Sequence, residues 1–226
     1  MYGPVIYKGD WSYVLETIED NSIDLIITDP LWSKKTIHIY EALTIASKRV
    51  LKNNGAMIIL TGGIQDDEII SAVKKQGMKR QTDFVFFMEG NGVWVPGTHV
   101  KTNHRKAMCF IKNENENPRV ISKNACILAK KDKRFHDYGQ PADLFILPVS
   151  ELCNRSGNTI VLDPFLGGGA CGIAAVSMGC SFIGIERNEK NYQIASNRIQ
   201  KFYDKIKVKT CLDPEIKKYF WLEEDL

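Results

Sequence analysis

Residues 160–172 read "IVLDPFLGGGACG", and this stretch decides how the rest of the chain is interpreted. An apolar run ends in an acid, a glycine-rich turn follows, and the next residues begin a helix pattern. Gly167, Gly169 and Gly172 have the GxGxxG spacing that brings a strand–turn–helix backbone close to a nucleotide. Glu186 ends the next apolar run, where an acid accepts hydrogen bonds from ribose hydroxyls. The pattern indicates an adenosine-type cofactor, and the alternative is a tight turn that merely needs glycines.

Apolar runs bounded by turn residues recur along the chain, and we interpret seven of them as strands. The predicted strands cover residues 4–7, 23–28, 56–60, 84–88, 107–111, 160–162 and 182–185. Stretches with helical spacing of apolar residues lie at 40–51, 66–76, 141–153, 170–178 and 189–206. Because strands and helices alternate, we expect an α/β fold with one seven-stranded, mostly parallel, doubly wound sheet.

The strand count bears on the kind of cofactor. A dinucleotide-binding domain that began at residue 160 would need several more strands after Glu186, but only one predicted helix and a lysine-rich tail follow. The missing strands must therefore be the five at the front of the chain. This order places the nucleotide-binding half at the C-terminal end and speaks against a nicotinamide-dependent oxidoreductase.

Length and composition set broad limits. The 226 residues are 44% hydrophobic, which suffices for one large domain with a buried core. The net charge of +3 is too small to indicate a polyanionic partner by itself. Six scattered cysteines form no CxxC pair and four histidines do not bracket them, so we expect no metal site. No leader pattern and no apolar run of roughly 20 residues is present, so we expect a cytoplasmic protein without membrane contact.

Four stretches resemble the permuted, beta-class DNA amino-methyltransferases, which use S-adenosyl-L-methionine. The opening "YKGDWSYVLETIEDNSIDLIITDPLW" is similar to the family's Gly-Asp turn, helix and "DNSxDLIxTDPP(Y/W)". "RVLKNNG" resembles its "RVLKPGG", "GNTIVLDPFLGGG" its "GDxVLDPFxGSG", and "IGIERNEKNYQIASNRI" its acidic strand end with the following helix. The resemblance spans residues 7–200 in the family's order. It implies a Rossmann-like methyltransferase fold with circularly permuted motifs and S-adenosyl-L-methionine as cofactor.

The resemblance identifies residues 29–32 as the catalytic turn. Its members are Asp29, Pro30, Leu31 and Trp32. The Asp29 carboxylate and the Pro30 carbonyl would accept the two hydrogens of an exocyclic amino group, and Trp32 would stack on an extruded base. Leu31 replaces the family's second proline. The alternatives are a helix N-cap for Asp29 and a core aromatic for Trp32.

The resemblance also implies a cofactor-binding set. It comprises Asp10, Asp163, Pro164, Phe165, Gly167, Gly169 and Glu186. Asp10 would bond the adenine amino group of the cofactor and Glu186 its ribose hydroxyls; an ordinary strand-end cap is the alternative for Asp10 and Asp163. The family's "HPTQKP" appears as "HDYGQP" at 136–141, where Gln140 is expected to substitute for the family's Gln.

The aspartate at the head of the catalytic turn resembles adenine-specific members, because cytosine-specific ones usually begin with Ser. We therefore expect methyl transfer to N6 of a flipped-out adenine in duplex DNA. The alternatives are N4 of cytosine in DNA, and adenine in RNA, because Trp32 resembles the "DPPW" of messenger-RNA methyltransferases. A non-catalytic nucleic-acid-binding subunit is a further alternative, motivated by Leu31 and a short recognition region.

We expect a single methyltransferase domain in four parts. These are a catalytic half at 1–111, a short target-recognition insert at 112–135, a cofactor-binding half at 136–210 and a tail at 211–226. Candidate phosphate contacts in the insert are Lys123, Lys130, Lys131, Lys133 and Arg134, with a solvated loop as the alternative. Because the insert is short, we expect a second copy or another subunit to help grip DNA, in a bacterial or phage-like, nucleoid-associated restriction-modification setting.

Overall fold

The computed structural model describes residues 3–30, 36–63, 65–94, 99–112, 127–129, 134–135, 139–153 and 159–212. Its strands are β1 (Val5–Lys8), β2 (Ile23–Thr28), β3 (Leu51–Thr61), β4 (Lys79–Met88), β5 (Val93–Trp94), β6 (Lys101–Thr102), β7 (His104–Ile111), β8 (Ile127–Ala129), β9 (Ile160–Asp163) and β10 (Ser181–Glu186). Its helices are α1 (Trp11–Glu16), α2 (Ile37–Val50), α3 (Asp66–Lys75), α4 (Asp143–Leu152), α5 (Ala170–Ser177) and α6 (Glu189–Leu212).

One large sheet organises the molecule, with the strand order β1-β10-β9-β2-β3-β7-β4-β8. Within the described part of this sheet, β7 alone runs antiparallel to its neighbours β3 and β4. All seven predicted strands and all five predicted helices are present. The predicted α/β, mostly parallel, doubly wound fold is therefore confirmed, with β8 added as an eighth strand and β5 and β6 forming a separate small ribbon.

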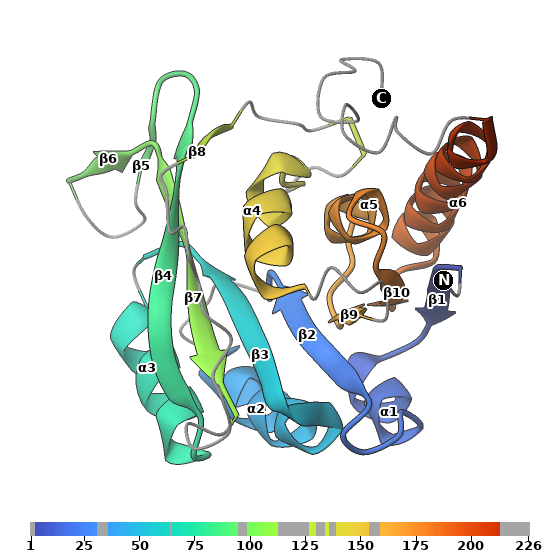
Figure 1. Cartoon of the computed structure of the whole chain (residues 1–226). Helices are drawn as coiled ribbons and strands as arrows, with labels where there is room; N and C mark the ends of the chain where they lie inside the picture. The colour runs from blue at the N-terminus through green and yellow to red at the C-terminus, as the bar shows by residue number, and fades with distance from the viewer. Residues whose placement is uncertain are drawn as a thin grey trace.

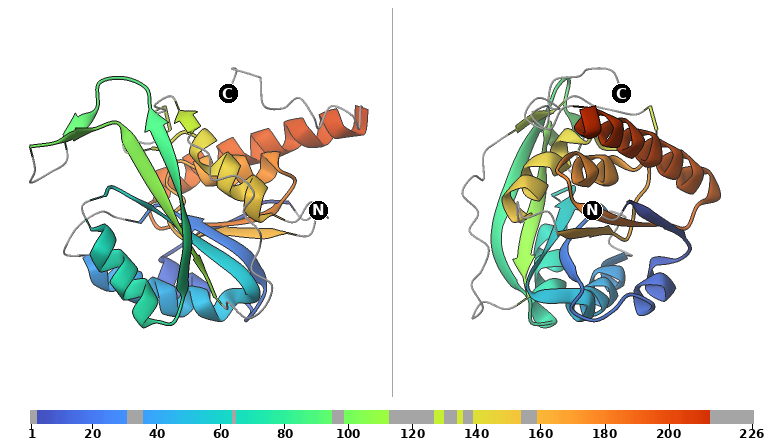
Figure 2. Two further views of the ribbon diagram at one scale, coloured as in Figure 1. Left: turned by 60° about the vertical axis from the view of Figure 1, so that its left-hand side comes forward. Right: turned by 45° about the vertical axis from the view of Figure 1, so that its right-hand side comes forward.

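Helices cover both faces of the sheet (Figure 1). Helices α1, α2 and α3 lie on one face, and α4, α5 and α6 lie on the other, as the two further views in Figure 2 also show. Each face has its own buried apolar cluster, and the alternating side chains of β2 and β3 contribute to both. In β2 all six residues are buried, as expected for a strand covered on both sides.

The two halves of the chain meet where β2 pairs with β9. Leu25 pairs with Val161 and Ile26 with Leu162 in parallel register. The buried Asp24 reinforces this junction, because its Oδ2 atom accepts bonds from the Ile160 N–H at 3.0 Å and from Lys52 Nζ at 2.8 Å. From this point the sheet grows in opposite directions, through β10 and β1 on one side and through β3 on the other.

Some boundaries differ from the predicted ones, and the differences have a physical cause. Strand β3 begins at Leu51 rather than at residue 56, although "KNNG" at 52–55 has the composition of a turn. Ile23 pairs with Leu51 and Leu25 with Ala56, so the polar residues form an irregularity between two paired positions of one strand. Strand β8 lies inside the predicted insert at 112–135 and pairs with β4, so β8 forms the edge of the sheet. In the described part of the chain, no helix combines the length and apolar character that a membrane span needs.

The Asp24 junction leads to a prediction about stability. Replacing Asp24 with Ala should lower the free energy of unfolding by about 1–3 kcal/mol, because a buried backbone N–H and a lysine lose their shared acceptor. Urea denaturation should show a lower midpoint at an unchanged slope. The matched control is Asp20→Ala, because Asp20 pairs with Arg49 on the exposed surface; its effect should stay within about 1 kcal/mol. Equal losses in the two variants would contradict the structural role of Asp24.

Candidate active site

Four carboxylates gather at one edge of the sheet. Strands β1, β10, β9 and β2 are adjacent and parallel, so their carboxyl ends lie side by side. Asp10 follows β1, Glu186 ends β10, Asp163 ends β9 and Asp29 follows β2. In open α/β sheets this edge, at the point where the strand order reverses, is where ligands bind. The structure thus brings together acids that the sequence placed at opposite ends of the chain.

The glycine turn is tied to the acid at the end of β10. The Gly167 N–H donates to Glu186 Oε2 at 2.9 Å, and the Asn188 N–H donates to Glu186 Oε1 at 2.7 Å. Gly169 caps α5 with a φ of 84°, in the left-handed region that favours glycine. The Arg198 guanidinium on α6 donates to the Gly168 carbonyl at 2.8 Å. These contacts fix the shape of the turn and leave Glu186 with further acceptor capacity.

Gly172, the last glycine of the GxGxxG pattern, serves packing. A Cβ atom at this position would lie 2.4 Å from Ile199 Cδ1 and 2.8 Å from Phe182 Cε1. Helix α5 can therefore approach α6 and β10 only because residue 172 has no side chain. This position does not by itself indicate a ligand.

Asp10 and Asp163 both cap local structure. Asp10 Oδ1 accepts bonds from the Ser12 N–H at 3.0 Å and the Ser12 hydroxyl at 2.7 Å, and these bonds lower the pKa of Asp10. Asp163 Oδ1 accepts from the Phe165 N–H at 3.0 Å, and its side chain is 3% exposed. Burial raises the pKa of Asp163 to about 7, helped by the nearby charges of Asp29 and Glu186. The structure thus shows a capping role for both residues, and the contacts of Asp10 and Asp163 with a cofactor stay predictions.

An aromatic pair links the first turn of the chain to the glycine turn. The rings of Trp11 and Phe165 have centroids 5.7 Å apart and are tilted by 39°. Trp11 directly follows Asp10, and Pro164 is buried beside Phe165. Phe165 and Pro164 were predicted from the sequence as cofactor-binding residues. Trp11 was not, because its only signal was its place next to "KGD". The pair brings the Gly-Asp turn and the glycine turn side by side.

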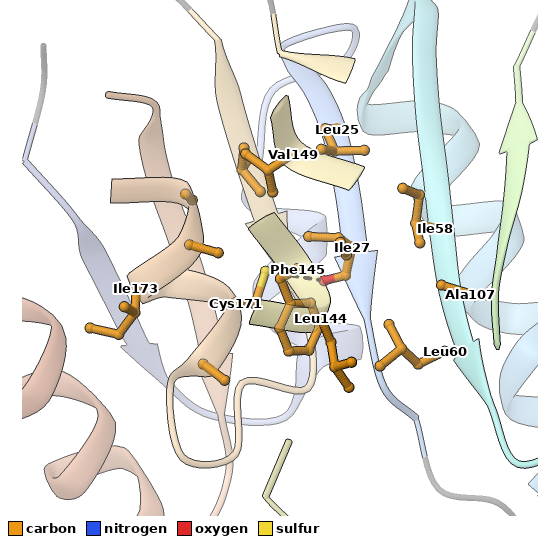
Figure 3. Close-up of a cluster of buried hydrophobic side chains, with 14 of the residues drawn as sticks. Leu25, Ile27, Ile58, Leu60, Ala107, Leu144, Phe145, Val149, Cys171 and Ile173 are labelled. Carbon is orange, nitrogen blue, oxygen red and sulfur yellow. Dashed lines mark hydrogen bonds between the residues drawn. The ribbon is translucent and has the colours of Figure 1, made fainter. Parts of the chain in front are cut away.

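Asp29 is contacted from the second half of the chain. The amide Nε2 of Gln140 donates to Asp29 Oδ2 at 3.1 Å. Gln140 directly precedes Pro141 and the start of α4, and α4 packs Leu144 and Phe145 near Ile27 of β2, as Figure 3 shows. Gln140 was predicted to bind cofactor, and in the structure it contacts the predicted catalytic acid. Pro30 is buried beside that acid.

Two further ionisable residues lie around Asp29. Tyr40 of α2 is fully buried, and its pKa is raised by burial and by the charges of Asp29 and Asp66. Arg105 of β7 is partly buried; burial lowers its pKa, while the charge of Asp29 acts in the opposite direction. Sequence reasoning missed Tyr40 and Arg105, because neither sits in a recognisable motif.

Several predicted residues fall outside the described ranges. They are Leu31 and Trp32 of the catalytic turn and Lys123, Lys130, Lys131 and Lys133 of the insert. Arg134 is described; it is exposed, and its guanidinium lies 5.3 Å from the Phe135 ring centroid. In the part of the chain that the structure describes, no cluster of three His, Cys, Asp or Glu residues could hold a metal ion.

Comparisons with known proteins identify the family of the chain. A family model for DNA methylases of the N6/N4 methyltransferase type matches residues 23–197. The chain is 25% identical over 253 residues to the type II methyltransferase M.HinfI of Haemophilus influenzae, covering 86% of this chain and 68% of that protein.

Solved structures share the fold. The M1.HpyAVI–SAM complex has a TM-score of 0.71 at 20% identity and covers 86% of this chain and 98% of its own. The PvuII DNA methyltransferase, which is cytosine-N4-specific, has a TM-score of 0.72 at 17% identity and covers 91% and 93%. The predicted Rossmann-like methyltransferase fold is confirmed. The family match includes every predicted site residue except Asp10.

The buried Asp163 predicts a pH dependence of stability. Its pKa rises on folding from an ordinary 3.8 to about 7. The stability that the neutral carboxyl contributes is therefore fully present below pH 3.8 and is lost as the pH rises through about 7. Asp163→Asn keeps an acceptor for the Phe165 N–H but does not titrate.

The free energy of unfolding of the native chain, minus that of Asp163→Asn, should fall by up to about 4 kcal/mol between pH 4 and pH 8. Urea denaturation at a series of pH values measures this difference. Asp67→Asn, at an exposed site on α3, is the matched control and should give a flat difference. A flat difference for Asp163→Asn as well would show that its carboxyl is ionised in the fold.

Proposed function

Since the chain belongs to the DNA methylase family, we propose that it transfers a methyl group from S-adenosyl-L-methionine to N6 of a flipped-out adenine in DNA. One observation carries the proposal. Asp29, from the head of the chain, lies at the same sheet edge as the glycine turn and Glu186 from its tail. An acceptor for an amino group and a predicted nucleotide-binding turn therefore share one edge, which is what transfer between two bound molecules requires.

The residues at this edge fit the proposed cofactor chemically. S-adenosyl-L-methionine supplies an electrophilic methyl group on a positively charged sulfur, and it carries amino and hydroxyl donors. The edge is rich in acceptors, because Asp10, Glu186 and Asp29 present carboxylate oxygens there. Asp10 would hold the adenine amino group and Glu186 the ribose hydroxyls, and the paired rings of Trp11 and Phe165 would supply an apolar contact.

The catalytic work falls to residues that hold the target nitrogen. An exocyclic amino nitrogen is a poor nucleophile, because its lone pair is delocalised into the ring. Asp29 and the Pro30 carbonyl would each accept one amino hydrogen, which favours tetrahedral geometry and directs the lone pair toward the methyl donor. The negative charge of Asp29 also stabilises the positive charge that develops on this nitrogen. Trp32 would stack on the extruded base.

Adenine is the proposed base because an aspartate heads the catalytic turn. Its carboxylate is a charged acceptor, whereas the serine that usually begins the cytosine-specific turns has a neutral hydroxyl. The reading of target sequence is assigned to the stretch 112–135, with its lysines and Arg134 as phosphate contacts. Because this stretch is short, a second copy or another subunit would complete the grip on duplex DNA. Because the proposed substrate is DNA, the protein would act at the nucleoid of a bacterial or phage-infected cell.

Methyl transfer tests the proposal directly. The purified chain is incubated with methyl-labelled S-adenosyl-L-methionine and mixed-sequence duplex DNA, and the digested bases are identified by mass spectrometry. The label should appear in N6-methyladenine. Asp29→Ala should reduce transfer by about 100-fold or more, because an acceptor for the reacting amino group is lost. Calorimetry should show that this variant still binds the cofactor.

The control variant is Asp67→Asn, which changes an exposed carboxylate on α3 and should leave transfer unchanged. Label in N4-methylcytosine, or in RNA only, would reassign the target base or nucleic acid. If the chain neither binds the cofactor nor transfers the label, the protein would instead be a non-catalytic nucleic-acid-binding subunit. Equal activity of Asp29→Ala and the native chain would refute the assigned role of Asp29.

A further inference from the structure

Gln140 has one contact that its predicted role does not explain. Its side-chain amide donates to Asp29 Oδ2 at 3.1 Å, although 111 residues separate the two along the chain. The bond joins the segment before α4 to the turn after β2, and both side chains are partly buried. The amide thus engages the carboxylate that would accept the target amino group.

The backbone at Gln140 is held by its surroundings. Pro141 follows directly, which fixes one backbone angle of residue 141 and restricts the conformation of residue 140. The Leu144 N–H donates to the Pro141 carbonyl at 3.3 Å, so Pro141 belongs to the first turn leading into α4. Leu144 is fully buried and Phe145 is 3% exposed, and both lie against β2 in Figure 3. The packing of α4 on β2 therefore sets the distance between Gln140 and Asp29.

The chemistry of the amide suits a carboxylate that must stay negative. A lysine or arginine in the same place would also donate, but its positive charge would offset the charge that Asp29 offers to the developing ammonium. A carboxamide orients the carboxylate without adding charge and without titrating. The bond from Gln140 to Oδ2 limits rotation of the Asp29 carboxylate, so the plane in which its oxygens accept hydrogens is held.

We infer that Gln140 is a positioning residue for methyl transfer, whose amide holds the Asp29 carboxylate in the orientation that accepts the target amino group. The inference rests on the proposed function and deepens it. Gln140 acts through Asp29 and on the transfer step, and it makes no direct contribution to cofactor affinity. This assignment replaces its predicted role as a cofactor ligand.

Kinetics separate the two roles of Gln140. In the full chain, Gln140→Leu removes the amide and should lower kcat for methyl transfer by about 10- to 100-fold, because a misplaced acceptor slows the step that depends on it. The dissociation constant of S-adenosyl-L-methionine, measured by calorimetry, should not change. The matched control is Gln200→Leu, because Gln200 donates to Asp204 Oδ1 at 2.9 Å on the exposed face of α6. Its kcat should equal that of the native chain.

A second variant gives a signature that loss of packing would not produce. In Gln140→Glu, two carboxylates face each other and share one proton, so the protonated member can still donate. As the pH rises and both ionise, the bond is lost and the two repel, so kcat should gain a falling limb at high pH that Gln140→Leu lacks. Tyr40 of α2, Arg105 of β7 and Asp163 of β9 also face Asp29 and are common to all variants.

The outcomes are distinct. An unchanged kcat in Gln140→Leu, a parallel loss of cofactor affinity, or a native pH profile in Gln140→Glu would overturn the inference and leave the proposed function intact. Thermal unfolding of each variant checks that the domain is folded when kcat is measured. If the native chain itself transfers no methyl group, the proposed function fails and this inference fails with it.

Discussion

The parallel pairing of β2 with β9 is the interaction on which the rest of the structure depends. It joins residues that lie 136 positions apart in the chain, and its register is set by two neighbouring pairs, Leu25 with Val161 and Ile26 with Leu162. The buried Asp24 binds the backbone of β9 and a lysine of β3 at once, so three strands are fixed together. A slip of one residue would take Asp24 away from the Ile160 N–H and Lys52 that it binds.

This pairing also explains why the chain order of the motifs matters little to the site. The strand order reverses between β2 and β9, and helices leave the two sides of this point toward opposite faces. The carboxyl ends of these strands therefore meet at one edge whichever half is synthesised first. Asp29 and Asp163 come together because of strand register, so a permuted sequence produces the same edge. The segment that leads into α4 then places Gln140 within hydrogen-bonding distance of Asp29.

The sequence predicted the sheet well because its strands are buried, and burial on both faces requires continuous apolar runs. It could not predict β8, whose three residues form a strand only by pairing with the edge of β4. The acids at the sheet edge were predictable, since strand ends and glycine turns leave local signals. Tyr40 and Arg105 were not, because their relation to Asp29 depends on how α2 and β7 pack. The bond from Gln140 likewise depends on the docking of α4.

Acids that lie close together at one edge repel one another when ionised, and each carboxylate has different hydrogen-bond partners that offset this repulsion. Asp10 is stabilised as an anion by Ser12, Glu186 accepts hydrogen bonds from two backbone N–H groups, and Asp29 accepts one from a neutral amide. Asp163 is the exception, because burial raises its pKa to about 7. Carboxylates gathered at one edge favour a cationic ligand over an anionic one, although the charges of Arg187 and Arg105 act on Asp10 and Asp29 and offset part of this preference.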